Sequence, residues 1–366
     1  MSASAFTRLW LPGFLLQSVI VGGGYATGRE LVEFFLSAGP LGGLLGMVVA
    51  AGLLSLLSAL AFEYARMTGS QNYRRFFVNL LGRGWWLYEI AYLVLMLLVL
   101  AVIAAATSEI AAGQWHLPPV LGTALLLVPV ALLVFRGSAV IEKVLAAWSF
   151  VLYAVYAILV LAYLWKSGGR VVEPFEHWPG DGAWLIKGIS YFGYNLAVIP
   201  LVLFCVSHMQ SRRDAFVAGA LAGPLVMIPA LMFYMAMVAS YPEILQSPVP
   251  ADFLMQRLDI GWLSFAFYVV VFGTFIETGT AMIHALNDRV AATIADRGWT
   301  MPGWLRPTIA IGAMLLASFL ALRYGIIALI ARGYGALTWA FILIFALPLA
   351  TRGVWQMRRS SVEQQP

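Results

Sequence analysis

The sequence predicts an all-α polytopic membrane protein with ten transmembrane helices, and three observations support this prediction. Of the 366 residues, 62% are hydrophobic and 11% are charged, whereas soluble globular chains have roughly 25% charged residues. Ten apolar stretches approach or exceed the roughly 20 residues of helix that cross a bilayer. The first and the sixth of these stretches are broken near mid-length by residues that disfavour helix. The composition therefore excludes a water-soluble protein.

The ten predicted spans follow one another along the chain. They are Leu9–Phe35, Leu41–Phe62, Trp85–Ala112, Pro118–Phe135, Ala139–Tyr163, Trp184–Ser207, Ala215–Ala239, Trp262–Ala285, Pro307–Leu322 and Tyr334–Leu349. The last two are the shortest, and the stretch between them (323–333) fits either a short surface helix or part of a span. The apolar run after Arg8 is long and ends in charges, which predicts a retained span and not a cleaved signal.

Basic residues decide the predicted orientation. With the N-terminus inside, most Lys and Arg residues that flank the spans fall on the cytoplasmic side, including the pairs 74–75, 212–213 and 358–359. This bias follows the positive-inside rule and places both termini in the cytoplasm. The net charge of +5 then reflects loops that face anionic lipid, and it requires no nucleic acid. We expect a multi-pass protein of a bacterial cytoplasmic (inner) membrane.

The first span is interrupted within the stretch VIVGGGYATGRELVEFF (19–35). Three consecutive glycines, Gly22, Gly23 and Gly24, each disfavour helix by about 1 kcal/mol relative to alanine. Close helix packing is the alternative explanation, but consecutive residues point to different faces of a helix. We expect an unwound segment at Gly22–Gly24 and a new half-helix from about Tyr25–Ala26. Unwound backbone exposes carbonyl groups to a cation, and a half-helix N-terminus attracts an anion such as an amino-acid carboxylate.

The sixth span carries a second interruption, in GISYFGYNLAVIP (188–200). Gly193 and Asn195 lie at mid-span, and Pro200 cannot donate a backbone hydrogen bond, which frees the backbone near Leu196. We therefore expect unwinding near Gly193–Asn195. Corresponding breaks in two halves of a chain are typical of transporter sites. The sequence thus predicts a single membrane domain made of two five-helix inverted repeats, residues 1–165 and 183–351.

Four segments together carry a resemblance to a known family. They are GGGYATGRELVEFF (22–35), GSAVIEKV (137–144), SYFGYN (190–195) and HALNDR (284–289). In these segments the chain resembles the YkvI-like amino-acid permeases, a branch of the amino acid–polyamine–organocation superfamily, and the resemblance covers essentially the whole chain. It implies a LeuT-type fold with helices 1 and 6 discontinuous, alternating access, and a substrate site between spans 1, 3, 6 and 8.

The resemblance also implies site residues at the matching positions. Those for the substrate are Gly22, Gly23, Gly24 and Tyr25 in span 1, and Phe192, Gly193 and Asn195 in span 6. The fold's mid-membrane sodium site uses carbonyls of span 1 and hydroxyls of span 8. The matching groups are the carbonyls of Ser18 and Val21, and the hydroxyl of Thr274 or Thr278. Many relatives have a neutral Gln where Arg29 stands, so a plain zwitterion site does not follow at that position.

Charged residues within spans cost about 2.5–3.5 kcal/mol each on insertion and are functional candidates. Glu277 is the deepest of them, and Thr274, Glu277 and Thr278 share one face of a helix. Three interpretations of Glu277 stay open: a ligand of a coupling ion such as sodium, a proton site, or a structural ion pair with Arg29.

Arg29 and Glu33 are one helical turn apart and can pair along the helix. Arg29 either belongs to a self-neutralising cluster near the outer surface or contacts an acidic group of the substrate as a binding residue. We expect Glu30 to point elsewhere, toward the outer vestibule.

Enzyme motifs do not occur in the sequence, which lacks a glycine-rich phosphate loop, HExxH and GxSxG. Its single cysteine, Cys205, rules out a disulfide within the chain. We therefore predict no enzyme but a secondary active transporter of an amino acid or similar small organic solute, cation-coupled to sodium or protons. The predicted partners are the solute and the lipid bilayer, with no nucleic acid, no protein partner and no cofactor beyond Na⁺ or H⁺. A transporter-like sensor or receptor that binds a solute without flux is the alternative.

Overall fold

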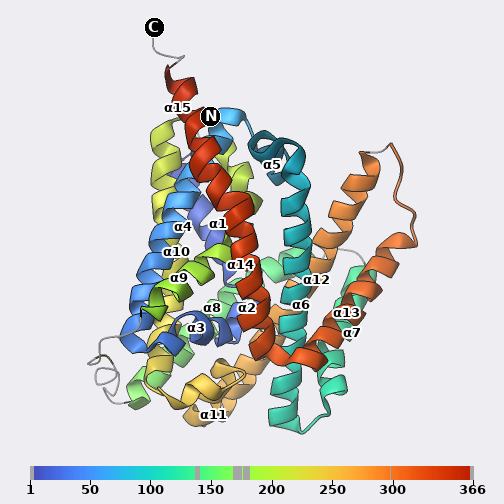
Figure 1. Ribbon diagram of the computed structural model, residues 1–366. Coiled ribbons are helices and arrows are strands. Elements are labelled where there is room, and N and C mark those ends of the chain that lie inside the picture. Colours follow the sequence, from blue (N-terminus) through green and yellow to red (C-terminus); the bar gives the residue numbers. More distant parts are fainter. Residues whose placement is uncertain (1–3, 137–140, 168–174, 176–181, 297, 363–366) are drawn as a thin grey trace.

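The computed structural model describes residues 4–136, 141–167, 175, 182–296 and 298–362, and all regular structure in these residues is helical (Figure 1). The α-helices in chain order are α1 (Leu11–Ile20), α2 (Gly23–Ala26), α3 (Arg29–Phe34), α4 (Pro40–Thr68), α5 (Tyr73–Leu81), α6 (Trp85–Trp115), α7 (Pro119–Arg136), α8 (Ile141–Ser167), α9 (Ala183–Asn195), α10 (Arg212–Val238), α11 (Pro250–Leu258), α12 (Gly261–Ala295), α13 (Leu305–Ala328), α14 (Gly335–Phe341) and α15 (Val354–Val362). The 3-10 helix η5 (Leu196–His208) continues α9, and the π-helical turn η7 (Leu329–Tyr334) joins α13 to α14.

The long helices have the length and composition of membrane spans. Six helical stretches in the described residues qualify, namely Pro40–Thr68, Tyr73–Trp115, Ala183–His208, Arg212–Val238, Gly261–Ala295 and Leu305–Arg359, and two shorter apolar helices accompany them. Large apolar side chains such as Val48, Leu161 and Phe265 face outward and are 63–73% exposed, as expected of a surface that contacts lipid. The chain is therefore a multi-pass membrane protein.

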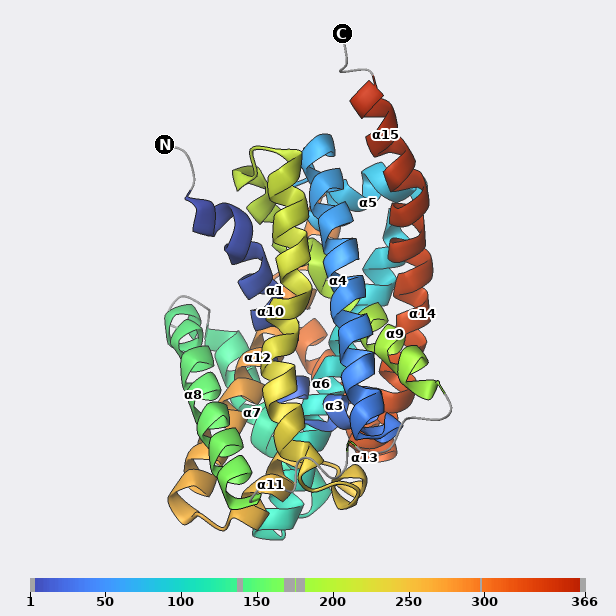
Figure 2. The same ribbon diagram turned by 90° about the vertical axis from the view of Figure 1, so that its left-hand side faces the viewer.

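Small residues let α4 and α10 approach one another closely. A Cβ atom on Gly219 of α10 would lie 2.2 Å from the backbone N of Ala59 on α4, and one on Gly223 would lie 2.0 Å from the Ala51 carbonyl oxygen. Figure 2 shows α4 and α10 side by side along much of their length. Glycine at these contacts permits the van der Waals packing that holds helices together in lipid.

The predicted ninth and tenth spans are two helices that meet at a break in the backbone at Gly325. Within α13 the backbone of Gly325 has φ 70° and ψ 168°, a conformation that glycine adopts at little cost. The segment 323–333 is divided at this glycine, and its part after Gly325 continues through η7 into α14 and does not form a separate surface helix. The chain then runs back toward the end of the molecule that carries both termini (Figure 1).

The first span is interrupted as predicted, but at different residues. α1 ends at Ile20, Val21 (φ −80°, ψ 53°) leaves the helical conformation, and Gly22 is extended. Gly23 and Gly24 are helical within α2, so the expected unwound segment Gly22–Gly24 and half-helix start at Tyr25–Ala26 are wrong by one to two residues. A second break, which the sequence did not reveal, lies at Gly28, whose φ of 76° favours glycine.

The sixth span differs from the prediction, because its helix is tightened and not unwound. Asn195 (φ −72°, ψ −13°) and Leu196 (φ −53°, ψ −32°) both keep helical dihedral angles. The hydrogen-bonding pattern changes from α to 3-10 at Leu196, and Pro200 lies inside the 3-10 part. Because neighbouring carbonyls still find partners in this tighter winding, the missing N–H of proline does not open the chain. The expected discontinuity at Gly193–Asn195 is therefore wrong.

Candidate functional site

A cavity of about 70 Å³ borders the first break of span 1. It lies where α1, α2 and α3 meet α6, α9, η5, η7 and α12. Its lining residues are Val19, Ile20, Gly22, Gly24, Tyr25, Glu30, Tyr92, Leu95, Met96, Val99, Tyr194, Asn195, Val198, Leu201, Thr278, Met282 and Tyr334. We call this space the central cavity.

Glu30 is the single charged residue among the described residues that line the central cavity. The turn at Gly28 folds α3 back so that the Glu30 carboxylate lies beside α2. A Cβ atom on Gly24 would lie only 2.6 Å from the Glu30 Oε1 atom. The Tyr194 hydroxyl donates a hydrogen bond to Glu30 Oε2, and Glu30 is 5% exposed. The carboxylate is therefore buried, held at one oxygen by a tyrosine, and turned toward the break.

Four tyrosines surround this carboxylate and the cavity. They are Tyr25, Tyr92, Tyr194 and Tyr334. The rings of Tyr194 and Tyr334 are stacked, with centroids 4.8 Å apart, and the Tyr334 hydroxyl would lie 3.5 Å from a Cβ atom on Gly24. Phenol rings combine an apolar face with a polar hydroxyl. The cavity can therefore hold a small solute with both polar and apolar parts.

The structure brings together four of the predicted substrate residues at the central cavity. They are Gly22, Gly24, Tyr25 and Asn195. Gly23 is the first residue of α2. Phe192 is buried and does not appear among the lining residues. A Cβ atom on Gly193 would lie 2.6 Å from the Thr338 side chain, so this glycine allows α9 to pack closely against α14.

The predicted coupling-ion residues are only partly assembled. Thr278 lies against the break, since its hydroxyl oxygen would be 3.8 Å from a Cβ atom on Gly22. Val21 is buried at the same break, whereas Ser18 is exposed on α1. The Thr274 hydroxyl donates to the Val270 carbonyl oxygen at 2.9 Å. The shared helix face of span 8 is thus present, and Thr278 is its member nearest the break.

Glu277 is half-buried on α12. Within the part of the chain that the structure describes, its carboxylate takes part in no hydrogen bond or ion pair, and no cluster of three His, Cys, Asp or Glu residues could hold a metal ion. Arg29 pairs with Glu33 and not with Glu277, at 3.1 Å between Nη2 and Oε2. The interpretation of Glu277 as the ion-pair partner of Arg29 is therefore wrong.

Arg29 holds a loop against the second break of span 1, at Gly28. Its Nη1 atom donates to the carbonyl oxygens of Leu245 at 2.8 Å and Ser247 at 3.1 Å. The backbone N–H of Ala251, at the start of α11, donates to the Thr27 carbonyl oxygen at 3.0 Å. The guanidinium is 6% exposed, and Arg29 does not line the central cavity. It therefore holds the loop before α11 against span 1.

α11 itself is tied to two long helices through Asp252. The Asp252 carboxylate accepts hydrogen bonds from Gln114 of α6 at 3.1 Å and from Tyr268 of α12 at 2.6 Å, and a third from Gln256. Burial raises the pKa of Asp252 above its usual range, and these three donors oppose the rise. Figure 1 shows α11 at the end of the molecule opposite both termini. That end of the bundle is therefore closed by a fastened segment.

The wall of the cavity nearer the termini is held by another buried pair. Arg289 of α12 donates to Glu89 of α6 at 2.8 Å. Its guanidinium also lies 4.0 Å from the ring centroids of both Tyr73 and Tyr92, a distance at which cation–π attraction operates. Since Tyr92 lines the cavity, this network fixes α6 relative to α12 beside it.

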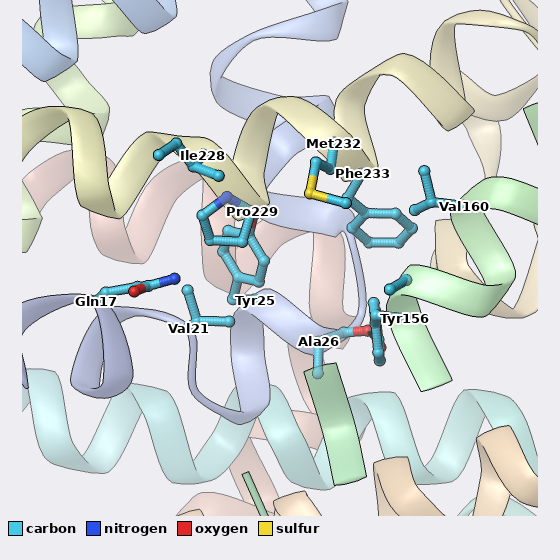
Figure 3. A pocket seen from close by; sticks show the side chains of 11 residues that line it. Gln17, Val21, Tyr25, Ala26, Tyr156, Val160, Ile228, Pro229, Met232 and Phe233 are labelled. Carbon is cyan, nitrogen blue, oxygen red and sulfur yellow. Dashed lines mark hydrogen bonds between the residues drawn. The ribbon is translucent and has the colours of Figure 1, made fainter. Parts of the chain in front are cut away.

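A larger, mostly apolar cavity of about 240 Å³ lies on the other side of Tyr25 (Figure 3). Its walls come from α1, α2, α8 and α10, including Pro229, Phe233 and Val160. The Tyr156 hydroxyl of α8 donates to the Ala26 carbonyl oxygen at the end of α2. Tyr25 and the break thus lie between the two cavities. The Glu30 carboxylate lines the central cavity, and none of the described residues that line the larger cavity is charged.

Sequence reasoning missed Glu30, because it assumed that span 1 breaks once and then continues as a straight half-helix. A straight half-helix would have directed Glu30 away from the glycines. Gly28 was the available signal, since glycine is the residue that most readily adopts the positive φ of a tight turn. The Thr27 hydroxyl indeed donates to the Gly24 carbonyl and accepts from the Arg29 N–H, which shapes this turn.

Comparison with known proteins identifies the fold. No protein-family model matches the chain. It is similar to YkvI, an uncharacterized membrane protein of Bacillus subtilis (strain 168), with 22% identity over 285 residues that cover 76% of this chain and 79% of the relative. The resemblance to YkvI noted in the sequence is confirmed.

Two solved structures share the architecture. One is a substrate-bound, outward-open Na⁺-coupled sialic acid symporter, with 14% identity and a TM-score of 0.62 over 92% of this chain and 78% of that one. The other is MhsT in complex with L-phenylalanine, with 15% identity and a TM-score of 0.57 over 95% of this chain and 88% of that one. The chain therefore has the LeuT-type fold of these transporters.

Proposed function

We propose that the chain is a secondary active transporter that moves an amino acid or similar small organic solute by alternating access. The observation that carries this proposal is the central cavity at the break of span 1, where a buried carboxylate and four tyrosines meet non-helical backbone at Val21 and Gly22. Non-helical backbone within a membrane is tolerated where it lines a cavity, and such breaks form the binding sites of this class of fold.

The arrangement of the bundle supports alternating access. The loop before α11 and α11 itself are fastened over the break at the end opposite the termini, through Arg29 and Asp252. α1 packs mainly against α10 and η5 on the other side of the break. A solute held at the break would leave through the end that carries the termini while the end with α11 stays closed. Release of the Arg29 contacts would open the end with α11.

The ten-span count and the two inverted repeats, residues 1–165 and 183–351, are part of this proposal. They are supported by the fold likeness over 92% of the chain and by the helical stretches that overlap the predicted spans. We further propose a bacterial cytoplasmic membrane with both termini cytoplasmic. Both termini lie at one end of the bundle (Figure 1), and basic residues cluster at that end.

Coupling to sodium or to protons is proposed for the residues of span 8 and the break. Thr278 lies beside Gly22, and Glu277 has no partner among the described residues. Glu277→Gln keeps the side-chain volume but removes the charge. A sodium site should then need higher sodium, and a proton site should lose its pH dependence. Unchanged responses to both ions would exclude Glu277 from coupling, and adding Arg29→Gln should rescue nothing, because Arg29 pairs with Glu33.

Uptake into proteoliposomes tests the proposed function. Purified full-length protein is reconstituted, and labelled solutes that raise its melting temperature are offered with an inward sodium gradient, an inward proton gradient, or neither. A transporter accumulates a solute with one gradient and loses it when an ionophore collapses that gradient. Gly24→Leu, which fills the cavity, serves as the inactive control. Binding without accumulation would refute transport and favour the sensor or receptor alternative.

A further inference from the structure

The chemistry that the central cavity recognises can be inferred further, on the basis of the proposed function. We propose that it binds the protonated amine of its solute against the Glu30 carboxylate, and that the solute needs no carboxylate of its own. The substrate class is thus small organic amines, of which amino acids are one kind.

The charge balance of the cavity supports this inference. Glu30 is 5% exposed, and none of the described residues that line the cavity is Lys, Arg or His. A buried carboxylate without a positive partner is strongly unfavourable. Arg29, its neighbour in sequence, is occupied by Glu33 and two loop carbonyls. A carboxylate in this position is neutralised either by a proton or by a cation from solution, and the proposal assigns it the cation, an ammonium group of the solute.

The space next to the carboxylate fits an ammonium group. Tyr194 donates to Glu30 Oε2, while Oε1 lies against Gly24, which has no side chain of its own, with the Tyr334 hydroxyl and the Val102 side chain beside the same point. An ammonium group offers three donors. One would reach Oε1 and another the Tyr334 hydroxyl on the same side of Gly24. The aromatic faces of the cavity further favour an organic cation.

An anionic group finds less support in the same cavity. α2 has four residues and α3 has six, so neither is long enough to develop the dipole that attracts a carboxylate. A solute carboxylate near Glu30 would also meet a like charge in a poorly hydrated space. The sequence-based expectation that the half-helix attracts a carboxylate therefore carries less weight than the pairing of an amine with Glu30.

Binding by matched compounds tests the proposal on the full-length protein in nanodiscs, by calorimetry and thermal shift. Each series holds an amino acid, the amine that lacks its carboxylate, and the acid that lacks its amine. The series are alanine, ethylamine and propionate; valine, isobutylamine and isovalerate; and phenylalanine, phenethylamine and hydrocinnamate. In the series that binds, we expect the amine to bind at least as tightly as the amino acid. We expect it to bind about tenfold or more tighter than the acid.

Two variants locate the effect. Glu30→Gln should weaken the amine about tenfold or more, with little change for any compound that lacks an amine. Glu109→Gln removes an acidic group from α6 away from the cavity and should leave affinity unchanged. If Glu30→Gln does not purify as a folded monodisperse protein, Glu30→Asp, which keeps the charge but shortens the reach, should show a smaller loss. The wild-type comparison of amine and acid requires no variant.

Several outcomes would overturn the proposal. These are an acid that binds as tightly as its amine, amino acids that bind while their amines do not, and an amine affinity unaffected by Glu30→Gln. The proposal would also fail if the wild type bound none of the amines and responded only to sodium or to acidification through Glu30. The other groups that face the site are Tyr25, Tyr92, Tyr194, Tyr334 and Thr278. Amine binding without uptake would refute transport alone, and uptake of an anionic solute would refute the amine alone.

Discussion

Adding a single methyl group at Gly24 tests the geometry of the central cavity. A Cβ atom there would lie 2.6 Å from Glu30 Oε1, 3.5 Å from the Tyr334 hydroxyl and 3.7 Å from Val102 Cγ1. Carbon and oxygen atoms do not approach so closely, so the carboxylate must shift by several tenths of an ångström. Since it is the end of a Glu side chain, the protein can still fold, but Glu30 leaves its preferred position beside Tyr194.

The expected loss follows from this shift. Driving a side chain about 30° from its rotamer costs roughly 0.5–1.5 kcal/mol, which corresponds to a roughly two- to twelvefold weaker affinity for an amine that must reach the displaced carboxylate. Stability should not fall in parallel, because alanine favours helix over glycine by about 0.5–1 kcal/mol within α2. Gly24→Ala therefore separates binding from folding.

Gly22→Ala is the matched control in the same interrupted segment. A Cβ atom at Gly22 would meet only the Val19 carbonyl oxygen at 3.4 Å and the Thr278 hydroxyl at 3.8 Å, and its φ of −93° suits any residue. Calorimetric titration with the tightest-binding amine and thermal melting are measured for both variants. An affinity of Gly24→Ala equal to that of the wild type would show that Glu30 does not lie over Gly24 in the binding state.

Single substitutions also test contacts elsewhere in the fold. Gly219→Ala forces α10 away from the backbone of α4 and should lower the melting temperature by an amount that corresponds to about 1–3 kcal/mol, whereas Gly52→Ala, with no atom within 4 Å, should not lower it. Arg29→Gln leaves the loop carbonyls of residues 245 and 247 without their charged donor, so proteolysis of that loop in intact proteoliposomes should accelerate, and an unchanged rate would count against the fastening role. Burial raises the pKa of Asp252, so its contribution to stability is present at low pH and is lost as pH rises through that raised pKa. Relative to Asp252→Asn, the wild type should lose melting temperature with rising pH, and parallel pH profiles would contradict this.

The sequence by itself determined the class of protein and the local pairing along one helix. A chain with 11% charged residues cannot cover a water-exposed surface, so membrane helices follow from composition alone. The interruption of span 1 also follows locally, because consecutive glycines disfavour helix wherever they stand. Arg29 and Glu33 pair as predicted, since residues four apart on a helix are neighbours irrespective of the rest of the fold.

Only the tertiary structure decided which groups face the cavity. Glu30 reaches Tyr194 across 164 residues of sequence, and Arg29 finds its carbonyl partners more than 200 residues away. Span 6 stays helical at Asn195 although its residues disfavour helix, because α9 is packed against α4 and α14. Local propensities amount to about 1 kcal/mol per residue, and close packing between helices outweighs them. The position of a break and the direction of a buried side chain are therefore fixed by contacts that no local stretch of sequence contains.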